Sequence, residues 1–281
     1  MNTRVRILSE CSIMVALATV LSLFKLLDLP YGGSVTLASM FPILLIAYRH
    51  GTLWGLSTAA VYGCVQLLLG LNSVSYFTTP LSIIAVILLD YILAFAVLGL
   101  GGIFRRFFAR QDIALLCGAA FACLLRYILH VIAGATVWPG LSIPDNAALL
   151  YSLGYNATYM VPETLILLLV TAYLSSLIDF RRRVPTRMPS VALGKPAAAC
   201  LLGAGAACIL ALGYAVIEIF AHLQNADSGD FDITGLSAVN WTLLGIVAAV
   251  AALLVAGLLL LARHFLRSRT HASAESNASV H

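Results

Sequence analysis

The chain has 281 residues, of which 61% are hydrophobic and 10% charged, and its mean hydropathy is +0.99. Soluble domains of this length carry about a quarter charged residues, so this composition excludes an ordinary soluble globular protein. The formal net charge of +4 is small, and we expect no nucleic acid partner. The composition predicts an all-α integral membrane protein, because only helices and closed barrels satisfy the backbone in lipid.

Apolar segments along the chain predict eight membrane-spanning helices, since about 20 apolar residues cross a bilayer. They cover residues 7–27, 35–50, 52–72, 81–104, 112–138, 148–179, 191–222 and 239–262. The second is short and contains Pro42, so we expect it to be tilted or irregular. The sixth contains Pro162, which removes a backbone donor and predicts a kink.

The distribution of basic residues predicts the orientation. With eight spans, the arginines before the first helix, in the loops near residues 49, 105–110 and 181–187, and after the last helix all fall on one side. The opposite loops, 72–80, 139–147 and 223–238, contain no Lys or Arg, and Lys25 is the only cation near that face. We therefore predict that both termini are cytoplasmic.

The basic, proline-containing segment "DFRRRVPTRMPS" (179–190) separates six helices from two. This break predicts a six-helix domain over 1–180, a linker over 181–190 and an additional two-helix segment over 191–263. The last residues, 264–281, are small and polar, and we predict that they are disordered.

Few ionisable residues lie well inside the predicted helices, and each is a functional candidate because charge in hydrocarbon is costly. These residues are Asp90, Arg126, His130 and Glu163. The structural alternative is that they neutralise one another, with Asp90 and Arg126 as a buried pair.

Several polar and aromatic side chains share one external layer with Asp90. His130 and Trp138 come from the fifth predicted helix, and Tyr151, Tyr155 and Asn156 from the start of the sixth. A carboxylate, an imidazole, a carboxamide and aromatic rings together suit a flat, cationic ligand. The alternative for the aromatic residues is an interfacial belt, which explains little about Asn156 and His130.

Residues 1 to about 180 resemble the ThiT/YuaJ family, the thiamine-specific substrate-binding (S) components of energy-coupling factor (ECF) transporters. The resemblance rests on "ILSECSIMVALA", "FPILLIAYRHG", "LLDY", "LLRYILHVIAGATVW" and "YSLGYN". It implies a multi-pass protein of the bacterial cell membrane with a six-helix fold. It also implies ligand contacts at Asp90, Tyr91, His130, Trp138, Tyr151 and Asn156.

Three departures from the family pattern concern the ligand. Asp90 stands where the family has a glutamate, Gly33 stands where it has a tryptophan that stacks, and a nearby family tyrosine is replaced, with Tyr76 close by. The ligand is thus left open between thiamine, a pyrimidine precursor and another flat cation.

The resemblance also implies partners, namely a transmembrane coupling protein and two cytoplasmic ATPases. Family members dock through small residues spaced four apart on the first helix, here Ser12 and Ala16. Small side chains let helices approach closely in lipid. Ordinary helix packing is the alternative for so short a motif.

The prediction is therefore a substrate-capture subunit of a vitamin importer, without enzyme activity, metal or cofactor. The sequence contains no GxxxxGK[ST] motif for nucleotide binding, and no HExxH or GxSxG motif for hydrolysis. Two alternatives use Asp90, His130 and Glu163 differently: a self-sufficient proton-coupled transporter, or an intramembrane enzyme with these groups as acid and base.

Overall fold

The computed structural model describes residues 3–29, 32–139, 148–188, 195–223 and 233–278. The predicted loops 139–147 and 223–238 lie largely outside these residues. The chain forms two compact units, Met1–Met188 and Pro189–His281, and each is described by itself.

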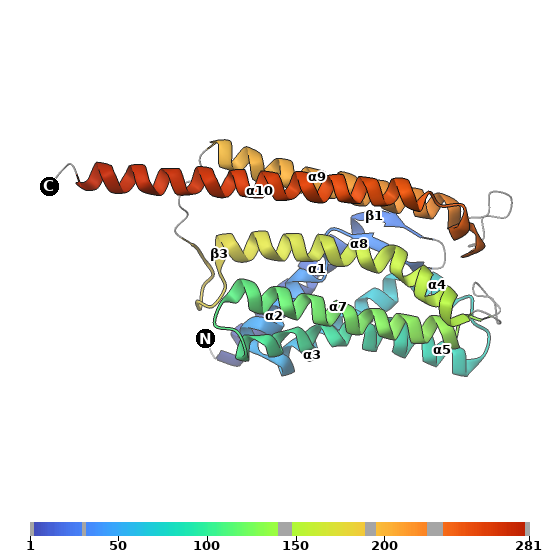
Figure 1. Ribbon diagram of the computed structural model, residues 1–281. Helices are drawn as coiled ribbons and strands as arrows, with labels where there is room; N and C mark the ends of the chain where they lie inside the picture. Colours follow the sequence, from blue (N-terminus) through green and yellow to red (C-terminus); the bar gives the residue numbers. More distant parts are fainter. Residues whose placement is uncertain (1–2, 30–31, 140–147, 189–194, 224–232, 279–281) are drawn as a thin grey trace. The chain divides into compact units, whose positions relative to one another are not determined.

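The first unit is a helical bundle with a small hairpin (Figure 1). Its long elements are α1 (Thr3–Leu23), α2 (Phe41–His50), α3 (Thr52–Leu69), α7 (Gln111–Thr136) and α8 (Ala148–Leu177). A continuous helical stretch comprises α5 (Pro80–Val86), the π-helix η2 (Ile87–Leu93), α6 (Ala94–Ala96) and the 3₁₀-helix η3 (Val97–Arg106). The short elements are α4 (Leu71–Val74) and the antiparallel pairs β1 (Lys25–Asp28) with β2 (Ser34–Thr36) and β3 (Ile178–Asp179) with β4 (Thr186–Arg187).

The helical membrane fold is confirmed, but one predicted span is wrong. Seven helices in the described residues are long and apolar enough to cross a membrane. The predicted span 35–50 is instead strand β2, a turn and the ten-residue α2. Ten residues of helix cover about 15 Å, half of a bilayer's hydrocarbon core. This segment is apolar because protein surrounds it: eight of its ten residues are buried.

The β1–β2 hairpin and α2 together bring the chain back to the end of the bundle where α1 begins. Arg49, near the end of α2, pairs with Glu10 of α1 and donates to the carbonyl of Phe180. Arg105 donates to the carbonyls of Tyr48 and Arg49. The basic segments predicted to share one side therefore meet at one end of the unit, whereas the cytoplasmic location of the termini stays a prediction.

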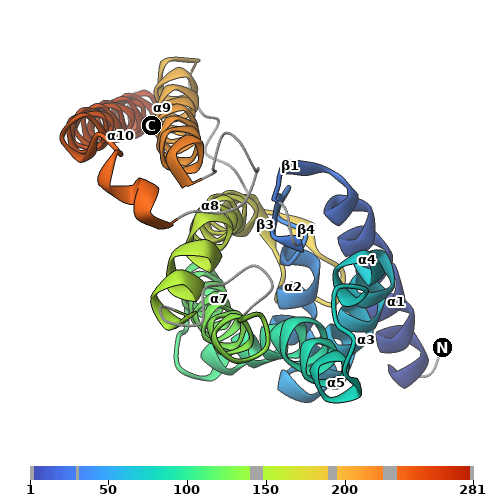
Figure 2. The ribbon, with the colours of Figure 1, turned by 90° about the vertical axis from the view of Figure 1, so that its right-hand side faces the viewer.

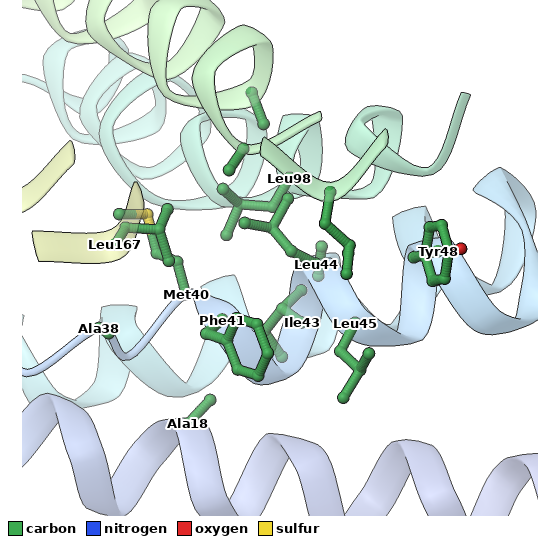
Figure 3. Close-up of a cluster of buried hydrophobic side chains, with 14 of the residues drawn as sticks. Ala18, Ala38, Met40, Phe41, Ile43, Leu44, Leu45, Tyr48, Leu98 and Leu167 are labelled. Atoms are coloured by element: carbon green, nitrogen blue, oxygen red, sulfur yellow. The ribbon is translucent and has the colours of Figure 1, made fainter. Parts of the chain in front are cut away.

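Helix α2 is the centre of the hydrophobic core. The view in Figure 2 shows α2 among α1, α3, α7 and α8. Met40, Phe41, Ile43 and Leu44 are each at most 7% exposed. Figure 3 shows this row of side chains with Ala18 of α1, Leu98 of η3 and Leu167 of α8. The ring of Phe41 also lies 6.0 Å from that of Phe180, with an edge-on geometry.

Two local irregularities shape the longer helices. Pro162 lies inside α8, and α8 bends along its length (Figure 1), which agrees with the predicted kink because proline cannot donate in the helical ladder. The predicted helix 81–104 is found over 80–106, but its centre is the π-helix η2, which contains Asp90 and Tyr91. Such π segments are rare and often mark functional sites.

The second unit consists of α9 (Lys195–Leu223), the 3₁₀-helix η5 (Ile233–Ser237) and α10 (Trp241–Ala278). Residues Pro196–Leu223 and Trp241–Phe265 are the two candidate spans in this unit. α10 continues as helix through Ala278, and the predicted disorder of 264–281 stays a prediction. The chain has no Gly or Pro between residues 258 and 278 that would end the helix.

Close approach of backbones holds α3 against η3. A Cβ atom at Gly99 would lie 2.2 Å from the amide nitrogen of Leu56 and 2.5 Å from the carbonyl carbon of Gly55. Both are main-chain atoms, so neither can move aside without shifting a helix. Glycine at position 99 is therefore required by packing, as in other lipid-embedded helix pairs.

We predict that Gly99→Ala lowers the thermal unfolding temperature of the purified protein, because overpacking a tight contact costs about 1–3 kcal/mol. Gly213→Ala in α9 is the matched control, since nothing lies within 4 Å of a Cβ atom there. The control should melt at or above the wild-type temperature, because alanine favours helix over glycine. Unchanged melting of Gly99→Ala would contradict the contact between α3 and η3.

Candidate ligand-binding site

A cavity of about 350 Å³ opens within the first unit. Its walls come from α1, the β1–β2 hairpin, α3, α4, the helical stretch 80–106, α7 and α8, so segments from much of the first unit meet around it. This volume lies within the usual range of small-molecule sites. Of the six predicted ligand contacts, five line the cavity: Asp90, Tyr91, His130, Trp138 and Asn156.

The sixth, Tyr151, is 2% exposed but does not line the cavity. Asn156 and Tyr159 are three residues apart on α8 and share a face with Glu163, four residues further on. Tyr151 precedes Asn156 by five residues, which turns it away by roughly 140° at 3.6 residues per turn. Tyr155 lines the cavity from the same helix instead.

Asp90 is the polar centre of one wall. Its Oδ1 lies 2.8 Å from Nδ1 of His130, and its Oδ2 accepts a hydrogen bond of 3.1 Å from the indole N–H of Trp138. Both carboxylate oxygens are therefore held by side chains from α7 and the residues just after it. Nε2 of His130 is buried without a hydrogen-bond partner in the described part of the chain, so its hydrogen-bonding capacity is unused there.

Trp138 lies inside the bundle rather than at a lipid-facing surface. It is 8% exposed, and its ring packs edge-on against Phe77 at 4.8 Å and lies 6.4 Å from the ring of Tyr76. The indole also lines the cavity. An aromatic belt residue would face the interface, so this placement favours the predicted pocket role.

Arg126 pairs with Glu163, and not with Asp90 as the structural alternative had it. Nη1 of Arg126 lies 2.9 Å from Oε2 of Glu163, and both side chains are under 10% exposed. The two residues meet because Glu163 lies two turns beyond Asn156 on α8, at the depth of Arg126, whereas Asp90 lies at the depth of His130 one turn away. Among the described residues, no arginine therefore pairs with Asp90.

Neighbouring groups complete the Arg126–Glu163 pair. The hydroxyl of Thr36 donates to Oε1 of Glu163 at 2.8 Å. The guanidinium of Arg126 lies over the ring of Phe95, 4.3 Å from its centroid, and Nη1 also contacts the sulfur of Met40. A buried ion pair needs such additional partners to offset its desolvation.

Asn156 is fixed by a small network that sequence reasoning only partly found. Its Nδ2 donates to the carbonyl and the hydroxyl of Ser152 at 2.9 and 3.1 Å, and its Oδ1 accepts from the hydroxyl of Tyr159 at 2.6 Å. Tyr159, which lines the cavity, was missed. Its spacing of three from Asn156 and four from Glu163 was the available signal.

Of the remaining predicted residues, Tyr91 lines the cavity and the two docking residues on α1 do not. The Tyr91 hydroxyl donates to the carbonyl of Gly70 at 3.0 Å, which ties η2 to the end of α3. Ser12 and Ala16 are exposed on α1 and do not line the cavity. They are thus accessible from outside the first unit, as a docking role requires.

Comparison with known proteins places this geometry in a family. The family model described as "Thiamine transporter protein (Thia_YuaJ)" matches residues 8–179. The thiamine transporter ThiT of Bacillus subtilis (strain 168) is 37% identical over 178 residues, which cover 59% of this chain and 88% of that relative. A solved structure of ThiT from Listeria monocytogenes aligns with a TM-score of 0.51 and 26% identity, covering 62% of this chain and 95% of that one.

The family match ends at residue 179 and includes every cavity-lining residue from Ser22 to Glu163. The matched region also contains five of the seven candidate membrane spans, four of them wholly and α1 in all but its first turn. On these grounds the chain is a multi-pass protein of the cell membrane and belongs to the thiamine transporter family.

Proposed function

We propose that this chain captures thiamine from outside the cell and acts as the S component of an ECF-type importer. It is a transport protein rather than an enzyme. A separate transmembrane coupling protein and two cytoplasmic ATPases would drive release. The observation that carries the proposal is the carboxylate of Asp90, held in a largely buried cavity by His130 and Trp138 with no arginine partner.

The charges around the cavity favour a cationic ligand. Among the described charged residues that line the cavity, Arg126 pairs with Glu163 and Lys25 pairs with Asp28, so Asp90 is the one without an arginine or lysine partner. Its side chain is only 15% exposed, which strengthens its attraction for a positive charge relative to water. Thiamine carries a flat, permanently cationic thiazolium ring, and a pyrimidine precursor would lack that charge.

The cavity also offers contacts for flat rings. Trp138 presents an indole, the best aromatic partner for a cation. The unpaired Nε2 of His130 can make a directional hydrogen bond with a ring nitrogen or amine. These groups support a ligand with both a cationic and a hydrogen-bonding ring.

A self-sufficient proton-coupled transporter is the second candidate, because Asp90 and His130 form a hydrogen-bonded pair that could exchange a proton. That mechanism needs Glu163 as the next site of a relay. Glu163 is instead held by an ion pair with Arg126 and a hydrogen bond from Thr36, so both of its carboxylate oxygens already have partners. The Arg126–Glu163 pair therefore favours the ECF-type importer over the proton-coupled transporter.

Binding and uptake measured separately distinguish the two candidates. The purified chain should bind thiamine in titration calorimetry. Cells that express the chain alone should not accumulate labelled thiamine, whereas cells that also express an ECF coupling module should. Accumulation by the chain alone, abolished by a protonophore, would support the proton-coupled alternative.

We predict that Asp90→Asn weakens thiamine binding by roughly 30-fold, because losing a partly desolvated ion contact with the thiazolium ring costs about 2 kcal/mol. An isostere with a neutral ring in place of the thiazolium is the control ligand, and its affinity should change much less. Equal losses for the two ligands in calorimetry would mean that Asp90 acts through structure and not through charge.

We also predict that Ala16→Trp abolishes ATP-dependent uptake while thiamine affinity stays within about twofold of wild type. A bulky side chain on the exposed face of α1 would separate helices whose association in lipid depends on close packing. Co-purification with the coupling subunits should be lost together with uptake. The predicted docking residue Ser12 should behave in the same way.

Ser57→Trp on α3 provides the matched control for Ser12→Trp. Both serines are exposed, and each hydroxyl donates to the carbonyl four residues earlier at 3.0 Å. Uptake should survive Ser57→Trp. Equal loss in the two variants would remove the α1 face as the specific docking surface.

A further inference from the structure

Gly33, which stands where the family pattern has a stacking tryptophan, has no room for a side chain. A Cβ atom built on Gly33 would lie 2.7 Å from Cδ1 and 2.9 Å from Cε1 of Tyr159. Among the described glycines, only Gly32 and Gly51 have a positive φ angle, so the backbone at position 33 accepts any residue. The ring of Tyr159 is therefore what excludes a larger residue there.

Tyr159 is held firmly in this place at the cavity wall. It is 6% exposed and comes from α8. Its hydroxyl donates to Oδ1 of Asn156, and its ring packs edge-on against His130 and Tyr155 at 6.1 Å each. Three contacts thus fix the orientation of one aromatic ring beside the Asp90–His130 pair.

We propose that Tyr159 contacts the ligand directly and supplies, from α8, the flat-ring contact that the family pattern places at position 33. This inference rests on the proposed function, because it takes thiamine as the ligand. Gly33 and Tyr159 then depend on each other, because the ring of Tyr159 occupies the space that a side chain at position 33 would need. Aromatic contacts with flat nitrogen heterocycles contribute enough for about a tenfold effect on affinity.

The test compares thiamine binding by titration calorimetry across Tyr159 variants, each first checked for a wild-type melting temperature and elution volume. Tyr159→Leu removes the ring and should weaken binding at least tenfold. Tyr159→Phe keeps the ring and loses only the hydrogen bond to Asn156, so its loss should be markedly smaller. Tyr127→Leu is the control, because Tyr127 does not line the cavity.

Gly33→Ala tests the same contact from the other side and leaves Tyr159 intact. The added methyl group must displace the ring, so affinity should fall several-fold in the wild-type background. In a Tyr159→Leu background the same change should have little further effect, because the ring that it displaces is gone. Contacting residues couple in this way, whereas independent sites give additive losses.

The outcomes separate this inference from the proposed function. If the wild-type chain does not bind thiamine, the proposed function fails and this inference fails with it. If the wild type binds thiamine but Tyr159→Leu binds equally well, only the role of Tyr159 is overturned. Equal losses for Tyr159→Leu and Tyr159→Phe also overturn it, because the hydroxyl would then act through Asn156. If Tyr159→Leu does not fold, unchanged affinity of Gly33→Ala overturns the proposal, and a several-fold loss supports it.

Discussion

The buried ion pair between Arg126 of α7 and Glu163 of α8 is the interaction on which the site depends. It joins the two helices that bring His130 and Asn156 to the cavity, and Thr36 of β2 donates a hydrogen bond to the carboxylate of the pair. Removing one partner of such a pair costs about 3–5 kcal/mol, because the other charge is left buried and unpaired. The pair therefore fixes the relative depth of α7 and α8. Because Arg126 is paired with Glu163, it is not available to Asp90, which lines the same cavity.

The position of Asp90 depends on a second constraint, the π-helix in the middle of the helical stretch 80–106. A π segment adds a residue to the turn and changes which side chains face inward. Here it presents Asp90 to His130 and Trp138, while Tyr91 reaches the end of α3. The shorter side chain of aspartate is accommodated because both of its oxygens find partners from α7 and the residues just after it. The position of this carboxylate is thus set by local helix geometry and by its partners His130 and Trp138.

Helix α1 connects the cavity with the exposed surface of the first unit. Ser22 of α1 lines the cavity and accepts a hydrogen bond from Gln66 of α3 at 2.9 Å, whereas Ser12 and Ala16 are exposed. α1 therefore carries both a cavity-lining residue and the proposed docking residues, which lie some two helical turns from it. The family match ends before the second unit begins. Its glycines at 205, 213, 245 and 257 have open space where a Cβ atom would lie.

Much of this protein follows from the sequence alone. The apolar composition determined a helical membrane protein, and the motifs around Asp90, His130 and Asn156 determined the family, because hydropathy and short motifs are local properties. The tertiary structure decided which buried charges pair, which apolar segment lies in protein instead of lipid, and which ring borders Gly33. Arg126 met Glu163 rather than Asp90 because pairing depends on the depth and rotation of three helices. α2 resembled a membrane span because a segment in a protein core can be as apolar as a segment in a bilayer. Only the packing around the segment distinguishes the two locations.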